Sequence, residues 1–182
     1  TICTNQRMHL FGEIVDGRMR LNEFGEIVVA EWLKTPTIRA EIELDEWVVM
    51  PNHFHAIVCI RRGDRPVAPT VAPPPRPVAR PGAANHAAHG PRPKSIGAMI
   101  AGFKSGVTTC INTKRGSPGA KVWQRGYYEH IIRDNESMGR IREYITMNPM
   151  KWGSDRENNQ RQAETPGRSS FRVAEEAAPW ET

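Results

Sequence analysis

Two stretches in the first third of the chain have the pattern of apolar residues that β-strands require. Residues 40–50 and 53–60 are rich in Val, Ile, Trp and Phe, and Pro51 and Asn52 stand between them. Short apolar runs separated by turn residues predict two paired strands.

The second strand divides its side chains between two chemically different faces. A period of two places His53 and His55 on one face, and it places Phe54 and its alternate neighbours on the other. The face of Phe54 is wholly apolar and is therefore expected to belong to a core.

The remaining elements follow from helical spacing and turn residues. Three helices are predicted, over 22–34, 95–114 and 134–148, together with a hairpin over 13–21 and a strand over 122–133. Residues 1–4 resemble the end of a strand whose beginning is missing. This order predicts a ferredoxin-like α+β fold, an antiparallel sheet with helices on one face and an added C-terminal helix. The histidine face of the sheet would then stay open.

The organisation of the chain is one domain with two polar or irregular segments. The domain spans 1–153 and is interrupted over 61–94 by an insertion dense in Pro, Ala, Arg and Gly, which is expected to be disordered. Its arginines could touch DNA, although a solvated loop of variable length is the simpler interpretation. Residues 154–182 form a polar tail in which nothing suggests chemistry.

Composition limits the possible environments of the protein. The formal net charge of +5 is compatible with nucleic acid but also with many other partners. Three scattered cysteines make no disulfide framework, and neither a signal peptide nor a long apolar span is present. These features predict a cytoplasmic location and no association with a membrane.

His53 and His55 are candidate metal ligands. Their backbone positions lie about 6 to 7 Å apart in a strand, so the two rings can lean together onto one divalent ion. Such a pair is more often solvent-facing or hydrogen-bonded. The chain lacks Cys-x-x-Cys and His-Glu-x-x-His motifs, which leaves an open site completed by oxygen ligands as the metal option. Mg²⁺ or Mn²⁺ suits such a site better than zinc.

Tyr144 is a candidate nucleophile and Asn148 a further metal ligand. They form an i, i+4 pair on the predicted helix over 134–148, so Asn148 could complete the shell of the ion while the phenol faces the same substrate. A tyrosine at such a position is usually a core residue. Since a free phenol has a pKa near 10, its attack would need activation by a metal ion.

Several residues before and within 122–133 are candidate contacts for single-stranded DNA. Binders of single strands combine cations with aromatic platforms for the bases. Lys104 and Arg125 are candidates for phosphate contact, and Trp123 and Tyr128 for base stacking. Solvated charges and ordinary core packing would look the same in sequence. Glu129 and His130 are candidates for orienting a ligand or moving a proton.

Three separated motifs resemble those of the REP-associated tyrosine transposases, which belong with the insertion sequence 200-like transposases in the HUH nuclease superfamily. The motifs are Val48-Val-Met-Pro-Asn-His-Phe-His-Ala-Ile-Val58, Val122-Trp-Gln-Arg-Gly-Tyr-Tyr-Glu-His-Ile-Ile-Arg133 and Glu143-Tyr-Ile-Thr-Met-Asn-Pro149. By position, His53 and His55 match the family's metal-binding pair and Tyr144 matches its nucleophile. Asn148 falls where members place a further ligand of varying identity.

The resemblance implies a transposase that cleaves and rejoins single-stranded DNA bearing hairpin, REP-like elements. The tyrosine attacks a phosphodiester with a divalent metal, and a 5′-phosphotyrosine link forms. Such a protein would act at the nucleoid. Relatives in the insertion sequence group work as dimers, whereas REP-associated ones need not, so the resemblance leaves a homodimer open. Two alternatives stay open, a non-catalytic or host-recruited binder of hairpin DNA and a metal-dependent phosphodiesterase that uses water.

Overall fold

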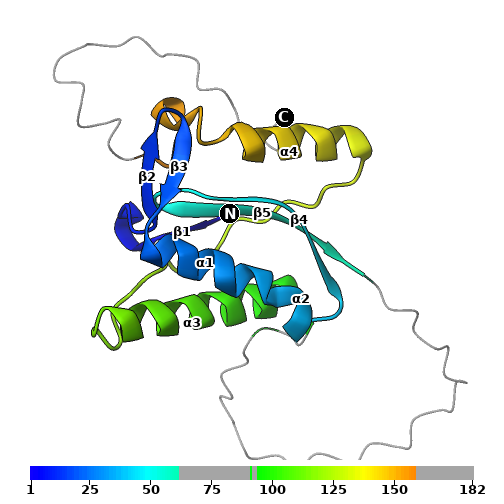
Figure 1. Cartoon of the computed structure of the whole chain (residues 1–182). Coiled ribbons are helices and arrows are strands. Elements are labelled where there is room, and N and C mark those ends of the chain that lie inside the picture. Colours follow the sequence, from blue (N-terminus) through cyan, green and yellow to red (C-terminus); the bar gives the residue numbers. More distant parts are fainter. Residues whose placement is uncertain (62–90, 92–93, 159–182) are drawn as a thin grey trace, which may run out of the picture.

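The computed structural model describes residues 1–61, 91 and 94–158. Most of the predicted insertion over 61–94, and the tail from residue 159 onward, lie outside the described residues. Within them the chain is a mixed α+β protein whose main sheet is antiparallel (Figure 1). This agrees with the α+β class predicted from the sequence.

The main sheet has three strands in the order β1-β5-β4, with β1 at Ile2–Cys3, β4 at Ile42–Val49 and β5 at His53–Ile60. β4 and β5 pair antiparallel from Val49 opposite Phe54 to Ile42 opposite Ile60, with an irregularity between Leu44 and Trp47. The predicted pair of strands around Pro51 and Asn52 is therefore confirmed.

A separate two-stranded ribbon stands at one side of the sheet. It pairs β2 (Gly12–Val15) with β3 (Arg18–Leu21). Both turn residues, Asp16 and Gly17, have positive φ angles of 51° and 70°, as a two-residue turn that matches strand twist requires. The predicted hairpin is confirmed, and the ribbon rises beside the end of α4 (Figure 1).

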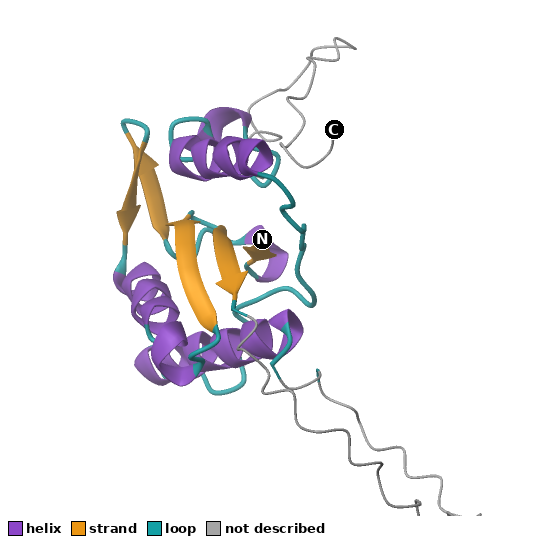
Figure 2. Ribbon diagram, turned by 90° about the vertical axis from the view of Figure 1, so that its right-hand side faces the viewer, coloured by secondary structure: helices purple, strands orange, loops and turns teal. Residues whose placement is uncertain are grey.

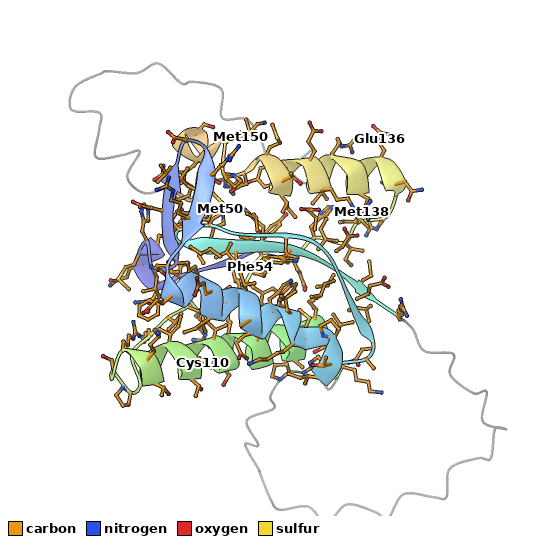
Figure 3. The ribbon with its side chains drawn as sticks, in the orientation of Figure 1. Met50, Phe54, Cys110, Glu136, Met138 and Met150 are labelled. Atoms are coloured by element: carbon orange, nitrogen blue, oxygen red, sulfur yellow. The ribbon has the colours of Figure 1, made fainter. Side chains whose placement is uncertain are left out.

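One face of the sheet is covered by α1 (Glu23–Leu33), the short α2 (Thr35–Ile38) and α3 (Ile96–Lys114). The aromatic rings of Trp32, Phe54 and Phe103 meet between these helices and β5, with centroids 4.9 to 5.5 Å apart. Figure 3 shows Phe54 below the sheet, on the side of α1 and α3. The apolar face of β5 thus belongs to the main core, as its alternation predicts.

The helix α4 (Asn135–Met147) lies on the opposite face, so the expectation that this face stays open is wrong. Ile141 and Ile145 pack with Ile57 of β5 in a second apolar cluster. Arg142 donates two hydrogen bonds of 2.9 and 2.6 Å to the carboxylate of Asp45 on β4. Figure 2 shows the sheet between the two helical layers, and in Figure 3 Met138 points from α4 towards the sheet.

Residues 122–133 do not form the predicted regular strand. Trp123 makes a single bridge to Thr4, and Tyr128 exchanges backbone hydrogen bonds of 2.9 Å with Thr1. Between these contacts Gly126 has a φ of 80°, which breaks the extended geometry. The neighbouring strand β1 has only two residues, so it cannot pair with a longer strand over 122–133.

The described part of the chain contains no helix long and apolar enough to cross a membrane. Cys3, Cys59 and Cys110 are free thiols. The sequence also predicts that these cysteines form no disulfide framework.

Candidate metal and nucleophile site

Three side chains of the kind that bind metals converge at the beginning of β5. His53, His55 and Asp155 each offer one ligand atom, and these atoms lie within 4.8 Å of one another. All three residues are buried, with exposed fractions of 0%, 3% and 7%. This grouping is compact enough for one ion to contact all three, because ligands at about 2.0 to 2.2 Å from a common ion lie close together.

The strand geometry of β5 places the two histidines. Their rings stand on the same face with centroids 4.6 Å apart, so the shared face predicted from the alternation is confirmed. Pairing of Cys3 with His53 and of Val48 with His55 fixes the strand on both sides. The two imidazoles are therefore positioned by a paired strand and not by a loop.

Asp155 reaches the histidines from the segment that follows α4. A 3-10 turn over Trp152–Ser154 redirects the chain, and the backbone N–H of Asp155 donates to the carbonyl of Trp152 at 3.2 Å. The carboxylate Oδ2 of Asp155 then lies 3.9 Å from Nε2 of His53. The ring of Trp152 packs near that of His53, with centroids 6.0 Å apart.

Asp155 is not predicted by the sequence pattern, which assigns residues from 154 onward to a tail without chemistry. That assignment is wrong for residues 155–158, where Asp155 and Asn158 are buried. The signal available in the sequence was weak: an acidic residue three positions after Trp152, with no periodicity around it. Its role arises from a tertiary contact that one sequence does not display.

Residues 155–158, called here the closing segment, are fixed to the beginning of the chain by several polar contacts. Arg7 forms a 3.0 Å ion pair with Glu157 and donates to the carbonyl of Arg156 at 3.0 Å. Asn52 donates to the carbonyl of Glu157 at 2.6 Å, and the thiol of Cys3 donates to its carboxylate at 3.3 Å. These contacts hold the two residues that directly follow Asp155, namely Arg156 and Glu157.

Among the buried polar atoms of the site that form no hydrogen bond with the described residues are Nε2 of His53, Oδ1 of Asn148 and Oδ2 of Asp155. The amide oxygen of Asn148 can only accept a hydrogen bond, and the same holds for the carboxylate oxygen when Asp155 is ionised. Leaving buried acceptors without a donor costs free energy, and such groups in folded proteins normally have a partner. The donor set of imidazole, carboxylate and amide oxygen fits a divalent cation. Asn148 stays a candidate ligand, as the sequence predicts.

Tyr144 stands against this group on α4. Its ring and that of His55 are 5.5 Å apart between centroids, and the residue is partly exposed. Burial, with a smaller contribution from the charge of Asp155, raises the pKa of Tyr144 to about 12, whereas Arg156 and Asn148 act in the opposite direction. The phenol is thus protonated at neutral pH and needs activation to attack.

Burial lowers the pKa of both His53 and His55. Asp155 opposes that effect at His53, and the neighbouring His53 adds to it at His55. Neutral imidazole is the form that binds metal ions, so both rings have the protonation state that a metal site requires.

Of the four residues predicted to contact DNA, two make internal contacts in the structure and two are exposed. Trp123 is in the main core, with its ring 5.1 Å from that of Phe11, so the prediction that it stacks on a base is wrong. Lys104 donates to the backbone carbonyls of Gln124 and Gly126, so its ammonium serves an internal contact. Arg125 and Tyr128 are exposed and stay candidates.

Glu129 and His130 line a mainly apolar cleft of about 650 Å³ beside the site. His55 lines the same cleft, as do Ile57 of β5 and Ile141 of α4. The structure thus brings Glu129 and His130 to the neighbourhood of the histidine pair but gives neither a contact with the metal-binding group.

Comparisons with known proteins identify a relative but no function. Neither a protein-family model nor a solved structure matches the chain. A Haemophilus influenzae protein that is named as an uncharacterized protein is 35% identical over 160 residues, which cover 85% of this chain and 81% of that protein.

Proposed function

The chain belongs to the same family as this Haemophilus influenzae protein, and we propose that it is a transposase-type enzyme that cleaves and rejoins single-stranded DNA through a 5′-phosphotyrosine intermediate. Its substrate would be DNA with hairpin, REP-like elements, and it would act on such DNA in the nucleoid. The motif resemblance suggests this reaction, and the geometry of the site supports it.

The observation that carries the proposal is the position of Tyr144 beside a buried metal-binding group. A single phenol against two neutral imidazoles, a carboxylate and an amide oxygen combines a nucleophile with a cation site. A structural histidine pair would not require acceptor atoms of Asn148 and Asp155 to converge on it. Packing of Tyr144 against the apolar cluster of Ile57, Ile141 and Ile145 holds its ring beside this group.

His53, His55 and Asp155, with Asn148, would hold Mg²⁺ or Mn²⁺. The ion, when bound, would act as a Lewis acid that polarises the scissile phosphodiester. Tyr144 would then attack the phosphorus: its Oη–P bond forms and the P–O3′ bond breaks. The phenolic proton passes to solvent, and the released 3′ oxygen takes up a proton from solvent. The phosphotyrosine conserves the bond energy, so the reverse attack by a 3′-hydroxyl needs no nucleotide triphosphate.

The strand order is consistent with a ferredoxin-like fold. Residues 123–128 bond to Thr1, Cys3 and Thr4 on the edge of β1 opposite β5, so they occupy the place of a fourth strand. The order would then be 122–128, β1, β5 and β4, with α1 and α3 as the crossovers. In this arrangement α4 is the added C-terminal helix that carries the nucleophile.

A water-using metal-dependent phosphodiesterase is the second candidate. The raised pKa of Tyr144 favours it, because a phenol with a pKa of about 12 is almost wholly protonated at pH 7. In that case Tyr144 would hold or orient a water molecule rather than form a bond to phosphorus.

A denaturing gel with end-labelled hairpin-bearing single-stranded DNA and Mg²⁺ or Mn²⁺ separates the candidates. We expect a metal-dependent covalent adduct that is lost in Tyr144→Phe and Asp155→Asn and retained in Tyr128→Phe, an exposed matched tyrosine. Cleavage without an adduct, surviving Tyr144→Phe, would support the phosphodiesterase. Tight binding with no cleavage would instead indicate a non-catalytic DNA-binding protein.

A further inference from the structure

Asn52 is a fully buried residue that contacts His53 and the closing segment at once. Its Oδ1 lies 2.8 Å from Nδ1 of His53. Its Nδ2 donates to the carbonyl of Glu157 at 2.6 Å and to the carbonyl of Arg7 at 3.3 Å. The exposed fraction of Asn52 is 0%, so water does not compete for these groups.

The two carbonyls decide the orientation of this amide. The end of the Asn52 side chain that faces Glu157 and Arg7 must be the NH₂ group, because an oxygen there would face two acceptors at close range. Its carbonyl oxygen therefore faces His53. An amide oxygen cannot donate, so the 2.8 Å contact requires a proton on Nδ1 of His53.

A proton on Nδ1 leaves the lone pair of a neutral His53 on Nε2. That nitrogen is the one directed at Asp155, with Oδ2 at 3.9 Å, and the side-chain amide of Asn148 lies near it. The imidazole thus presents an acceptor towards the carboxylate instead of a donor. The arrangement is unfavourable for the pair alone and suited to a cation between them.

We propose that Asn52 is a positioning residue of the metal site, which fixes His53 as the Nδ1–H tautomer and holds the closing segment so that Asp155 faces Nε2. The proposal rests on the metal site of the proposed function but does not require DNA cleavage. Residues hydrogen-bonded to metal-binding histidines commonly change metal affinity by about ten- to a hundredfold when removed.

The tautomer can be measured on the whole protein without metal, DNA or any substitution. We expect ¹⁵N-edited NMR correlations of the His53 ring at pH 7.5 to show Nδ1 protonated and Nε2 unprotonated. A proton on Nε2 of His53 would overturn the proposal, because the ring would then donate towards the site. This result is independent of whether the protein forms a phosphotyrosine.

Variants test the consequence for binding, with Mn²⁺ as the probe in calorimetry. Asn52→Leu removes the acceptor for Nδ1–H and should weaken Mn²⁺ binding by about ten- to a hundredfold. Asn52→Asp keeps that acceptor and should retain the Nδ1–H tautomer and more of the affinity. Asn112→Leu is the matched control, because Asn112 is also buried and its Nδ2 donates to the backbone carbonyl of Ala120 at 2.9 Å. Unlike Asn52, it lies on α3.

Two outcomes of the variant series would overturn the proposal. One is a folded Asn52→Leu protein whose Mn²⁺ affinity and His53 tautomer are unchanged. The other is an equal loss of affinity in Asn112→Leu, which would reduce the effect to general destabilisation. If the unmodified protein binds no Mn²⁺ while His53 has the Nδ1–H tautomer, the positioning of His53 stands and the proposed metal function fails.

Discussion

Tyr144 and Asp155 define the chemistry of the site at the scale of single residues. Asp155 is buried and within reach of both His53 and Tyr144, and its negative charge raises the pKa of the phenol. A bound divalent ion would neutralise that charge and remove this obstacle to ionisation. In the proposed function, the same carboxylate would therefore bind the metal ion and link its binding to the protonation of Tyr144.

Removing the charge of Asp155 should weaken metal binding more than it disturbs the fold. We expect Asp155→Asn to lower Mn²⁺ affinity by at least about tenfold, because an anionic ligand is replaced by a neutral one of similar shape. Calorimetry and a thermal melt measure the two effects. Asp16→Asn, on the exposed hairpin turn, is the control and should leave the affinity unchanged. Full affinity in Asp155→Asn would exclude a ligand role for this residue.

The elements differ in how far the sequence predicts them. The pairing of β4 with β5 and the helix α4 follow from local signals: alternation, a Pro-Asn turn and a capping residue at Asp134, whose side chain accepts a hydrogen bond from Ser137 at 2.7 Å. The segment over 122–133 has similar β-forming residues but lacks a partner long enough to template a strand. The closing segment depends on contacts with Arg7 and Asn52, which no local pattern reports.

The aromatic residues of the 122–128 segment should separate into a structural and a binding role. Trp123→Ala should lower the free energy of unfolding by about 3 to 5 kcal/mol, since it empties a core position between Phe11 and Phe103. Tyr128→Ala should change stability little, because Tyr128 is 46% exposed. If Tyr128 stacks on a base, that variant should weaken binding of single-stranded DNA by about 1 to 3 kcal/mol.

Urea unfolding and fluorescence anisotropy measure these two quantities separately. A stable Trp123→Ala protein with impaired DNA binding would contradict the assignment of Trp123 to the core. Unchanged DNA affinity in Tyr128→Ala would remove the remaining aromatic candidate for stacking.

At the scale of the whole molecule, α4 adds a third layer to the sheet and its helices, and this layer covers the histidine face. The helix α4 covers the face of the sheet that carries the histidines (Figure 1), and the closing segment brings Asp155 to the same face. Arg142 connects α4 to Asp45 of β4. The histidine pair is therefore part of an interior, and its protonation is coupled to folding.

The metal-free protein should lose stability as the pH falls below about 6.5. Burial lowers the pKa of His53 and His55 from the ordinary value of 6.5, so the unfolded chain binds more protons than the folded one below that pH. The contribution is fully present above pH 6.5 and is lost as the pH falls through the lowered folded-state values. Urea titrations from pH 7.5 to pH 5 measure it.

The control for this dependence is His130→Gln, because His130 is exposed. That variant should retain the loss of stability between pH 6.5 and pH 5, and saturating Mn²⁺ should oppose the loss by binding the neutral imidazoles of the folded state. A free energy of unfolding that does not change over this range would contradict the burial of neutral histidines.

The identity of the residue that bonds to DNA tests the central claim most directly. The chain has three tyrosines, and tryptic cleavage separates Tyr144, in the peptide 143–151, from Tyr127 and Tyr128, in the peptide 126–133. After reaction with hairpin-bearing single-stranded DNA and Mn²⁺ followed by nuclease and trypsin digestion, mass spectrometry should find a 5′-linked nucleotide on peptide 143–151. An adduct on peptide 126–133, or cleaved DNA with no modified peptide, would contradict attack by Tyr144.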